Sequence, residues 1–241
     1  MASAAADPGS RAPRSRHILW RPAHRIIPSR FPPVGLFDRV ADPADLDALY
    51  ALEAMTNDRI RDEAGQISLV PAAERIAGPG TTPIMAAFTH LNSQGSRFSD
   101  GSYGVYYCTH SLDTALAEVR YHQERFLRRT AQAPITLQLR LYLSKLEARL
   151  ADVRKIAEYH DPSHYAPGQR LARQLRNSGS DGVLYRSVRD PGGLCAAVFR
   201  PKTLGPCQQS THFAFHYDGN SIVAIDAISP VWTTASARSP A

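Results

Sequence analysis

Apolar and polar residues alternate most clearly between residues 135 and 141. Four aliphatic residues are interleaved with three polar ones there: Ile135, Thr136, Leu137, Gln138, Leu139, Arg140 and Leu141. Alternation with a period of two is typical of a strand with one buried face. Shorter runs of the same character predict further strands at residues 105–108, 182–188, 195–199, 211–217 and 221–225.

Three stretches have helical spacing instead. Asp42 and Pro43 suit the start of a helix, whose apolar positions are Leu46, Leu49, Leu52 and Met55 or Thr56. Ser111 can cap a second helix, with Asp113 in its first turn and one side formed by Leu112, Ala115, Leu116, Val119, His122 and Phe126. The third helix is expected over residues 169–177, with Leu171 and Leu175 on its apolar side and an end near Gly179.

The order of these elements predicts the fold class. Short strands dominate the second half of the chain, and the turns at residues 190–193 and 218–220 each join two of them. Helices and strands do not alternate regularly, as they would in a doubly wound parallel sheet. We therefore expect an α+β fold with mainly antiparallel sheets and flanking helices, in a single domain over residues 17–232. Residues 1–16 are expected to form a flexible extension and residues 233–241 a flexible tail.

Composition narrows the class of protein. The chain has 241 residues, of which 43% are hydrophobic and 21% charged, so it can bury a core and is not predicted to be disordered. The chain contains no run of 18 apolar residues, so no membrane span is predicted. The first 16 residues lack the apolar segment of a secretory signal. Three widely spaced cysteines, Cys108, Cys195 and Cys207, exclude a disulfide scaffold. We expect a cytoplasmic protein.

The charge is basic and is carried by arginine. There are 28 basic and 22 acidic residues, which gives a net charge of +6, and only Lys145, Lys155 and Lys202 are lysines. Arginine suits bidentate contacts with phosphate, so a phosphorylated ligand or a nucleic acid is compatible with this charge. Genome-level composition also explains the excess of arginine, because alanine is abundant in this chain as well. Charge alone therefore does not decide between these interpretations.

Several signatures of catalysis or metal binding are missing from the sequence. It contains no phosphate-binding P-loop, dinucleotide-binding glycine motif, nucleophile elbow or His-Glu-x-x-His zinc motif. Two histidine pairs remain, His160 with His164 and His212 with His216. The second pair, on a predicted strand, would lie about 13 Å apart, too far to share a metal. We expect solvated polar faces and no metal.

One loop–strand–helix unit brings chemically useful residues together. Arg97 lies among small residues in the loop 95–101, Tyr107 follows in a strand, and Glu118 lies at the edge of the apolar stripe of the next helix. A structural interpretation is open for each charged residue. Glu118 can pair with an arginine or with His122, and Arg97 can brace its loop.

This unit resembles the RES domain, a family named for its Arg, Glu and Ser. The resemblance is carried by residues 95–98, Tyr107, the run 114–118 and the run 185–189, and it extends over residues 21–225. The arginine motif of the family usually reads Gly-Gly-Arg-Trp-Asn, and here Ser96, Phe98 and Ser99 replace three of its residues. Arg97 and Glu118 match the first two family residues. Ser187 is the candidate serine, with Ser180 as a competitor.

The resemblance implies an ADP-ribosyltransferase-like fold and a toxin that binds NAD+ as its substrate. Members of the family are paired with Xre-type helix-turn-helix antitoxins and arrest growth by consuming NAD+ or by ADP-ribosylating a protein. The restraint on such an enzyme could be an antitoxin segment that enters the NAD+ cleft, where a terminal carboxylate would meet Arg97.

The residue types suit NAD+ cleavage. Breaking the nicotinamide–ribose bond creates an oxocarbenium ion, which a carboxylate such as Glu118 stabilises. Arg97 would hold the pyrophosphate, while Tyr107 and Phe98 would stack on nicotinamide. Ser187 would bind the carboxamide or orient Glu118. The acceptor of ADP-ribose, whether water, phosphate or a protein, is not specified by these motifs.

Two other functions compete with this one. The arginine excess is compatible with an RNA-cleaving or nucleic-acid-binding protein, but no recognised RNA-binding motif is present, so we expect no direct nucleic-acid binding. The third alternative is a small interaction module without catalysis. A half-buried glutamate near an arginine and a tyrosine disfavours that alternative.

Overall fold

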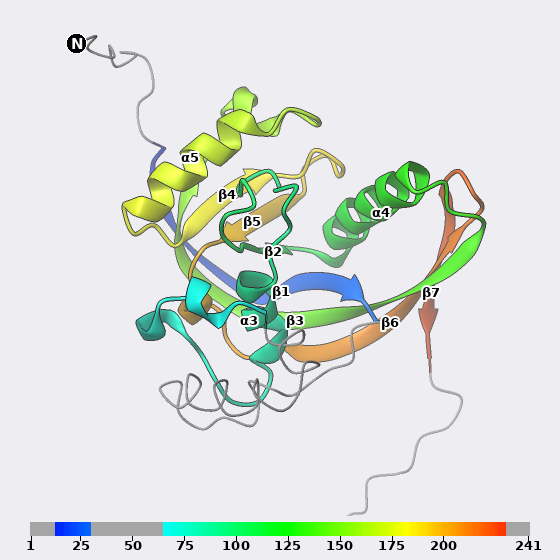
Figure 1. Cartoon of the computed structure of the whole chain (residues 1–241), viewed down its shortest axis with the longest axis horizontal. Helices are drawn as coiled ribbons and strands as arrows, with labels where there is room; N and C mark the ends of the chain where they lie inside the picture. Colours follow the sequence, from blue (N-terminus) through cyan, green and yellow to red (C-terminus); the bar gives the residue numbers. More distant parts are fainter. Residues whose placement is uncertain (1–12, 30–64, 230–241) are drawn as a thin grey trace, which may run out of the picture.

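The computed structural model describes residues 13–29 and 65–229, and these form one mixed sheet with three α-helices (Figure 1). The predicted helix at Asp42, residues 1–12 of the predicted extension 1–16, and the predicted tail 233–241 lie outside the described residues, whereas Ser15 and Arg16 of that extension belong to the first strand. The strands are β1 (Ser15–Pro28), β2 (Tyr106–Thr109), β3 (Ile135–Asp152), β4 (Gly182–Arg186), β5 (Leu194–Val198), β6 (Gln208–Tyr217) and β7 (Ile222–Ile228). The helices are α3 (Thr82–Thr89), α4 (Leu112–Arg129) and α5 (Ala166–Asn177). Short 3-10 turns lie at Ile67–Leu69, Ala72–Glu74, Ala157–His160 and Pro201–Thr203.

The strands follow the order β1-β2-β5-β4-β3-β6-β7, and β1 also pairs with β3. This extra pairing closes five strands into a ring, from which β6 and β7 extend. Among the strand pairs of the described residues, only β3–β4 is parallel. The predicted α+β class with mainly antiparallel strands is confirmed.

Strand β3 is the centre of the sheet and is much longer than predicted. Its first half lies between β1 and β6, and its last residues pair with β4. The extension beyond residue 141 alternates as well, because Lys145, Glu147 and Arg149 are exposed while the residues between them are buried. The alternation is therefore present in the sequence over the whole second half of the strand.

Each helix covers its own part of the core. Helix α3 packs with Trp20 and Tyr106, α5 with Val183 and Tyr185, and α4 with Leu139 and Phe215. In Figure 1, α5 and α4 lie on either side of β4 and β5. This arrangement places both helices beside the loop that joins β4 to β5.

Helix α4 begins where the sequence predicts. Ser111 Oγ accepts a hydrogen bond from the Thr114 amide, as an N-cap does. The predicted apolar side is wrong at its C-terminal end, because Phe126 is 54% exposed and Leu127 is buried instead. His122 is also largely exposed, with 55% of its side chain accessible. In its last two turns, α4 therefore packs against the sheet through the side that carries Leu127 and not through the side that carries Phe126.

Two observations bear on the environment of the chain. Among the described residues, no helix combines the length and apolar character needed to cross a membrane. Cys108, Cys195 and Cys207 are all buried and free.

Candidate active site

The loop that carries Arg97 is held by Tyr107 of β2. The Phe98 amide donates to the Tyr107 hydroxyl at 3.0 Å, and the same hydroxyl lies 2.7 Å from Ser96 Oγ. Burial raises the pKa of Tyr107 to about 12, so its proton is retained and is available to Ser96. Tyr107 thus fixes the backbone on both sides of Arg97.

Helix α5 holds the same loop from the other side. Gln169 Nε2 donates to the carbonyl oxygens of Ser96 and Ser99, at 2.9 and 3.2 Å. A Cβ atom on Gly168 would lie 2.5 Å from the Arg97 carbonyl oxygen, so only glycine allows this approach. The position of Arg97 is therefore defined by contacts between segments distant in sequence.

The Arg97 side chain is braced along one edge. It is only 9% exposed, and Nη1 donates to the carbonyl oxygens of Tyr159 and Asp161 at 2.9 and 2.7 Å. The guanidinium also stacks on Tyr165, 4.8 Å from the ring centroid. Nε and Nη2 make no hydrogen bond to any residue in the described ranges. Arg97 thus braces the chain and still presents a two-donor edge.

Glu118 lies in the second turn of α4 and is held by Ser187. Ser187 Oγ donates to Glu118 Oε1 at 2.6 Å, and the Glu118 side chain is 19% exposed. Ser187 Oγ also accepts from the amides of Arg189 and Asp190, at 3.0 and 2.9 Å. A hydroxyl has one proton and two lone pairs, so this serine is fully used and its proton points at Glu118.

No arginine or lysine of the described residues pairs with Glu118. Within the described part of the chain, its ion-pair contact is with His122, whose Nε2 lies 3.8 Å from Oε2. Partial desolvation lowers the pKa of His122, and the nearby Arg189 and Arg125 lower it further, although Glu118 acts in the opposite sense. His122 is therefore a weaker base than an unperturbed histidine. Arg97 and Glu118 do not pair with each other, so a structural ion pair between them does not explain either residue.

Arg97 and Glu118 nevertheless share one neighbourhood. Burial raises the pKa of Tyr185, the charge of Glu118 raises it further, and the charge of Arg97 lowers it. Phe98 packs edge-on against the Tyr185 ring, with centroids 4.9 Å apart. Phe98 has no exposed surface, so this structure does not offer the contact with a ligand that we expected of it.

The histidine pairs serve other contacts. His160 Nε2 accepts from the Arg186 amide at 3.1 Å, which leaves Nδ1 to donate to the Ile156 carbonyl at 2.9 Å. Both ring nitrogens of His160 are therefore engaged. His212 and His216 contact different partners, Gln209 and Asp226 respectively. The described residues contain no group of three or more metal-ligating side chains.

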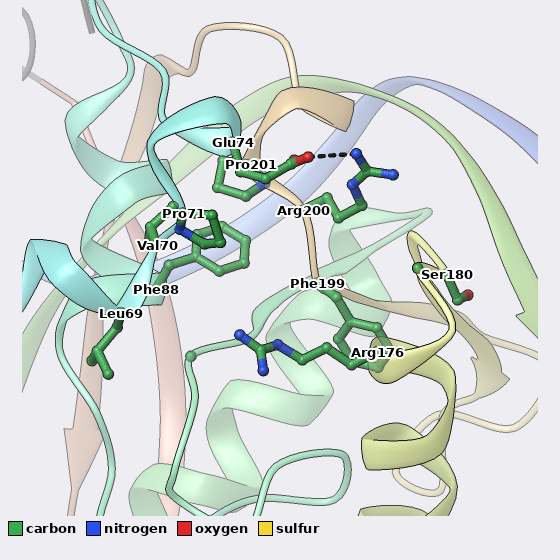
Figure 2. A pocket seen from close by; sticks show the side chains of 12 residues that line it. Leu69, Val70, Pro71, Glu74, Phe88, Arg176, Ser180, Phe199, Arg200 and Pro201 are labelled. Atoms are coloured by element: carbon green, nitrogen blue, oxygen red, sulfur yellow. Dashed lines mark hydrogen bonds and ion pairs between the residues drawn. The ribbon is translucent and has the colours of Figure 1, made fainter. Parts of the chain in front are cut away.

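A cavity of about 400 Å³ lies at the opposite end of β4 and β5. Figure 2 shows the ion pair between Glu74 and Arg200 on one wall and Arg176 extending from α5. Ser180 also lines this cavity, and its Oγ hydrogen-bonds with the backbone of Gly182. Ser180 is thus separated from Glu118 by the length of β4, and Ser187 is the serine beside the carboxylate.

A family model described as the RES domain matches residues 72–218, more than half of the chain. The matched stretch contains the arginine, the glutamate and the serine just described. The chain belongs to the RES domain family. In this RES domain Ser187, which follows β4, contacts Glu118 of α4.

Two known proteins are similar to this RES domain. The uncharacterized protein y4oC of Sinorhizobium fredii (strain NBRC 101917 / NGR234) is 33% identical over 201 residues, which cover 83% of this chain and 84% of the relative. A chain in the crystal structure of the M. tuberculosis MbcT–MbcA toxin–antitoxin complex is 12% identical, with a TM-score of 0.42. That match covers 86% of this chain and 87% of the other.

Proposed function

We propose that this RES domain is an enzyme that cleaves the nicotinamide–ribose bond of NAD+. The observation that carries the proposal is Glu118, a half-buried carboxylate aimed by Ser187 and left without an arginine or lysine partner in the described residues. A fixed carboxylate in a partly desolvated site stabilises positive charge more strongly than it would in water.

The chemistry requires little more than this charge. When the C1′–N bond breaks, its electron pair goes to the nicotinamide nitrogen, which leaves as a neutral ring. The ribose becomes an oxocarbenium ion, and Glu118 Oε2, which is not bonded to Ser187, would face it. A nucleophile then attacks C1′ and loses its proton. No general acid is needed, because the leaving group is already neutral.

The surrounding charge suits a dinucleotide. The free Nε–Nη2 edge of Arg97 has the geometry of a bidentate phosphate contact. Arg125 and Arg189 lie close enough to lower the pKa of His122, so the region around Glu118 has a positive field. Tyr107 supports the site by holding the Arg97 loop, and we retain its ring as the surface for nicotinamide.

We further propose that the protein is the toxin of a toxin–antitoxin pair and has an Xre-type antitoxin as its partner. Membership in the RES domain family supports this proposal. An antitoxin segment with a terminal carboxylate would bind the free edge of Arg97 and exclude the pyrophosphate of NAD+. Without the antitoxin, the enzyme would act in the cytoplasm and arrest the growth of the cell.

The test is incubation of the purified protein with NAD+ and measurement of free nicotinamide. Parallel reactions contain buffer alone, inorganic phosphate, or cell lysate with labelled NAD+. We expect nicotinamide release in at least one of them. Release in buffer identifies water as the acceptor, phosphate dependence identifies phosphate, and label on one lysate protein identifies a protein acceptor. A folded protein that releases no nicotinamide in any reaction would contradict the proposal.

A further inference from the structure

The loop between β4 and β5 is joined to α4 at two positions, one helical turn apart. Thr114 Oγ1 donates to Asp190 Oδ2 at 2.6 Å, and Glu118 accepts from Ser187 at the same distance. Residues four apart lie on the same face of a helix. The two contacts therefore lie side by side between α4 and the loop 187–190.

We propose that Thr114 and Asp190 are positioning residues that set the hydrogen bond between Ser187 and Glu118. This inference rests on the proposed function, because it assigns the two residues an effect on the turnover of NAD+. Neither needs to touch the substrate. They act by fixing the loop that aims the catalytic carboxylate.

The direction of the hydrogen bonds shows how the two contacts are coupled. Thr114 is fully buried and gives its one proton to Asp190, so Ser111 Oγ, 2.7 Å away, must donate to Thr114. This hydroxyl chain ends on a carboxylate, which strengthens each bond in it. The Asp190 amide in turn donates to Ser187 Oγ at 2.9 Å. Thr114 thus holds Asp190, and the Asp190 amide is one of the two amides that orient the Ser187 hydroxyl.

Gly193 leaves the space that this contact needs. A Cβ atom there would lie 2.5 Å from Asp190 Oδ2 and 2.6 Å from Thr114 Oγ1. The backbone of Gly193 also closes the turn, because its amide donates to Asp190 and its carbonyl accepts from the Ser187 amide. A methyl group at position 193 would collide with both side chains, and because Thr114 is β-branched and fully buried, Asp190 is the side chain that would be displaced.

Four variants test the proposal. Thr114→Val removes the hydroxyl, Gly193→Ala inserts a wedge, and Thr114→Ser keeps the hydroxyl. Thr130→Val is the matched control, since its hydroxyl bonds only with carbonyls at the other end of α4. We expect the first two variants to lower kcat about 10-fold or more with KM within about twofold. Thr114→Ser and Thr130→Val should retain turnover.

The route through Ser187 is tested by a double-mutant cycle. If Thr114 acts by positioning Ser187, Thr114→Val should change kcat by less than about twofold in a Ser187→Ala background. An equal loss in both backgrounds, or unchanged kcat in the single variants, would overturn the proposal.

Amide hydrogen exchange provides a readout that needs no NAD+. Thr114→Val and Gly193→Ala should speed exchange of the Arg189 and Asp190 amides about 10-fold or more in the free protein. Unchanged exchange would overturn the proposed restraint on the loop. If the wild-type protein releases no nicotinamide but the two variants exchange these amides faster than the wild type, the proposed function is refuted and the proposed restraint on the loop stands.

Discussion

The Ser187 hydroxyl shows how little freedom the site has at the scale of single residues. Two amides occupy its lone pairs, so its proton has one destination, Glu118 Oε1. Oε1 is thereby used in orientation, and Oε2 remains for the substrate. The carboxylate is preorganised before any ligand arrives, which is the condition for electrostatic stabilisation of a transition state.

Arg97 combines a bracing role and a binding role, and a conservative variant should affect both. Arg97→Lys loses the Nη1 hydrogen bonds to Tyr159 and Asp161, and it also loses the Nε–Nη2 edge that would bind phosphate. We expect KM for NAD+ to rise about 10-fold or more and Tm to fall by several degrees, as measured by steady-state kinetics and calorimetry.

The matched control for Arg97→Lys is Arg173→Lys, which alters an exposed ion pair with Asp100 on the same side of the molecule. Exposed pairs contribute little to stability, so this control should change neither KM nor Tm. Similar values for the two variants would contradict both roles of Arg97.

Sequence motifs predict Arg97, Glu118 and Ser187 as site residues, and the structure places Ser187 against Glu118, whereas Phe98 is fully buried. The first three are matched by local motifs, and the helical position of Glu118 indicated partial burial. Phe98 is buried because its loop is enclosed by Gly168 of α5 and Tyr185 of β4, contacts about 70 and 90 residues away. The role of Tyr107 in holding the loop depends on the same long-range packing.

At the scale of secondary structure, α4 is tied to the β6–β7 hairpin by a buried carboxylate. Glu124 accepts from Arg120, Arg128 and the buried amide of Ile222. Its pKa is lowered: burial alone would raise it, but these three donors outweigh that effect. We expect Glu124→Ala to lower the free energy of unfolding by about 1–3 kcal/mol, because the Ile222 amide is left unpaired.

Urea denaturation measures this effect, with Glu158→Ala as the control. Glu158 is exposed, so its removal should be nearly neutral. Equal stabilities of the two variants would show that the contact between Glu124 and Ile222 contributes nothing.

The strands illustrate which elements a single sequence can predict. Strand β3 was predicted from its alternation, and the β6–β7 hairpin from its turn residues. Strand β1 was missed, because Pro22, Pro28 and several basic residues interrupt any apolar pattern. It exists through its pairing with β3, which includes a register shift between Trp20 and Ala23. Phe126 was misplaced because periodicity alone does not show which side of the last turns meets the sheet.

At the scale of the whole molecule, three histidines predict how stability depends on pH. Burial is the largest cause that lowers the pKa of His24, His122 and His160 below the ordinary value of 6.5. Below that pH the unfolded chain binds protons that the folded chain does not. Stability should therefore fall between about pH 7 and pH 5, and these groups should contribute no pH dependence above about pH 7.5.

Urea denaturation at pH 7.5, 6.5 and 5.5 measures this dependence. The paired carboxyls of Glu124 and Asp152 have lowered pKa values, so their contribution is present in this range and is lost only at lower pH. A free energy of unfolding that stays constant or increases from pH 7.5 to pH 5.5 would contradict the lowered pKa values of these histidines.

The central claim, that Glu118 stabilises charge which develops only during bond cleavage, is tested most directly by Glu118→Gln. Glutamine keeps the shape and an acceptor for Ser187 but removes the charge. The measurement is nicotinamide release from NAD+ beside Tm, with Glu158→Gln as the control. We predict a fall in kcat of about 100-fold or more, roughly 3 kcal/mol of transition-state stabilisation, with KM and Tm nearly unchanged. Turnover that falls only in proportion to a lost folded fraction, or that is retained, would contradict the account.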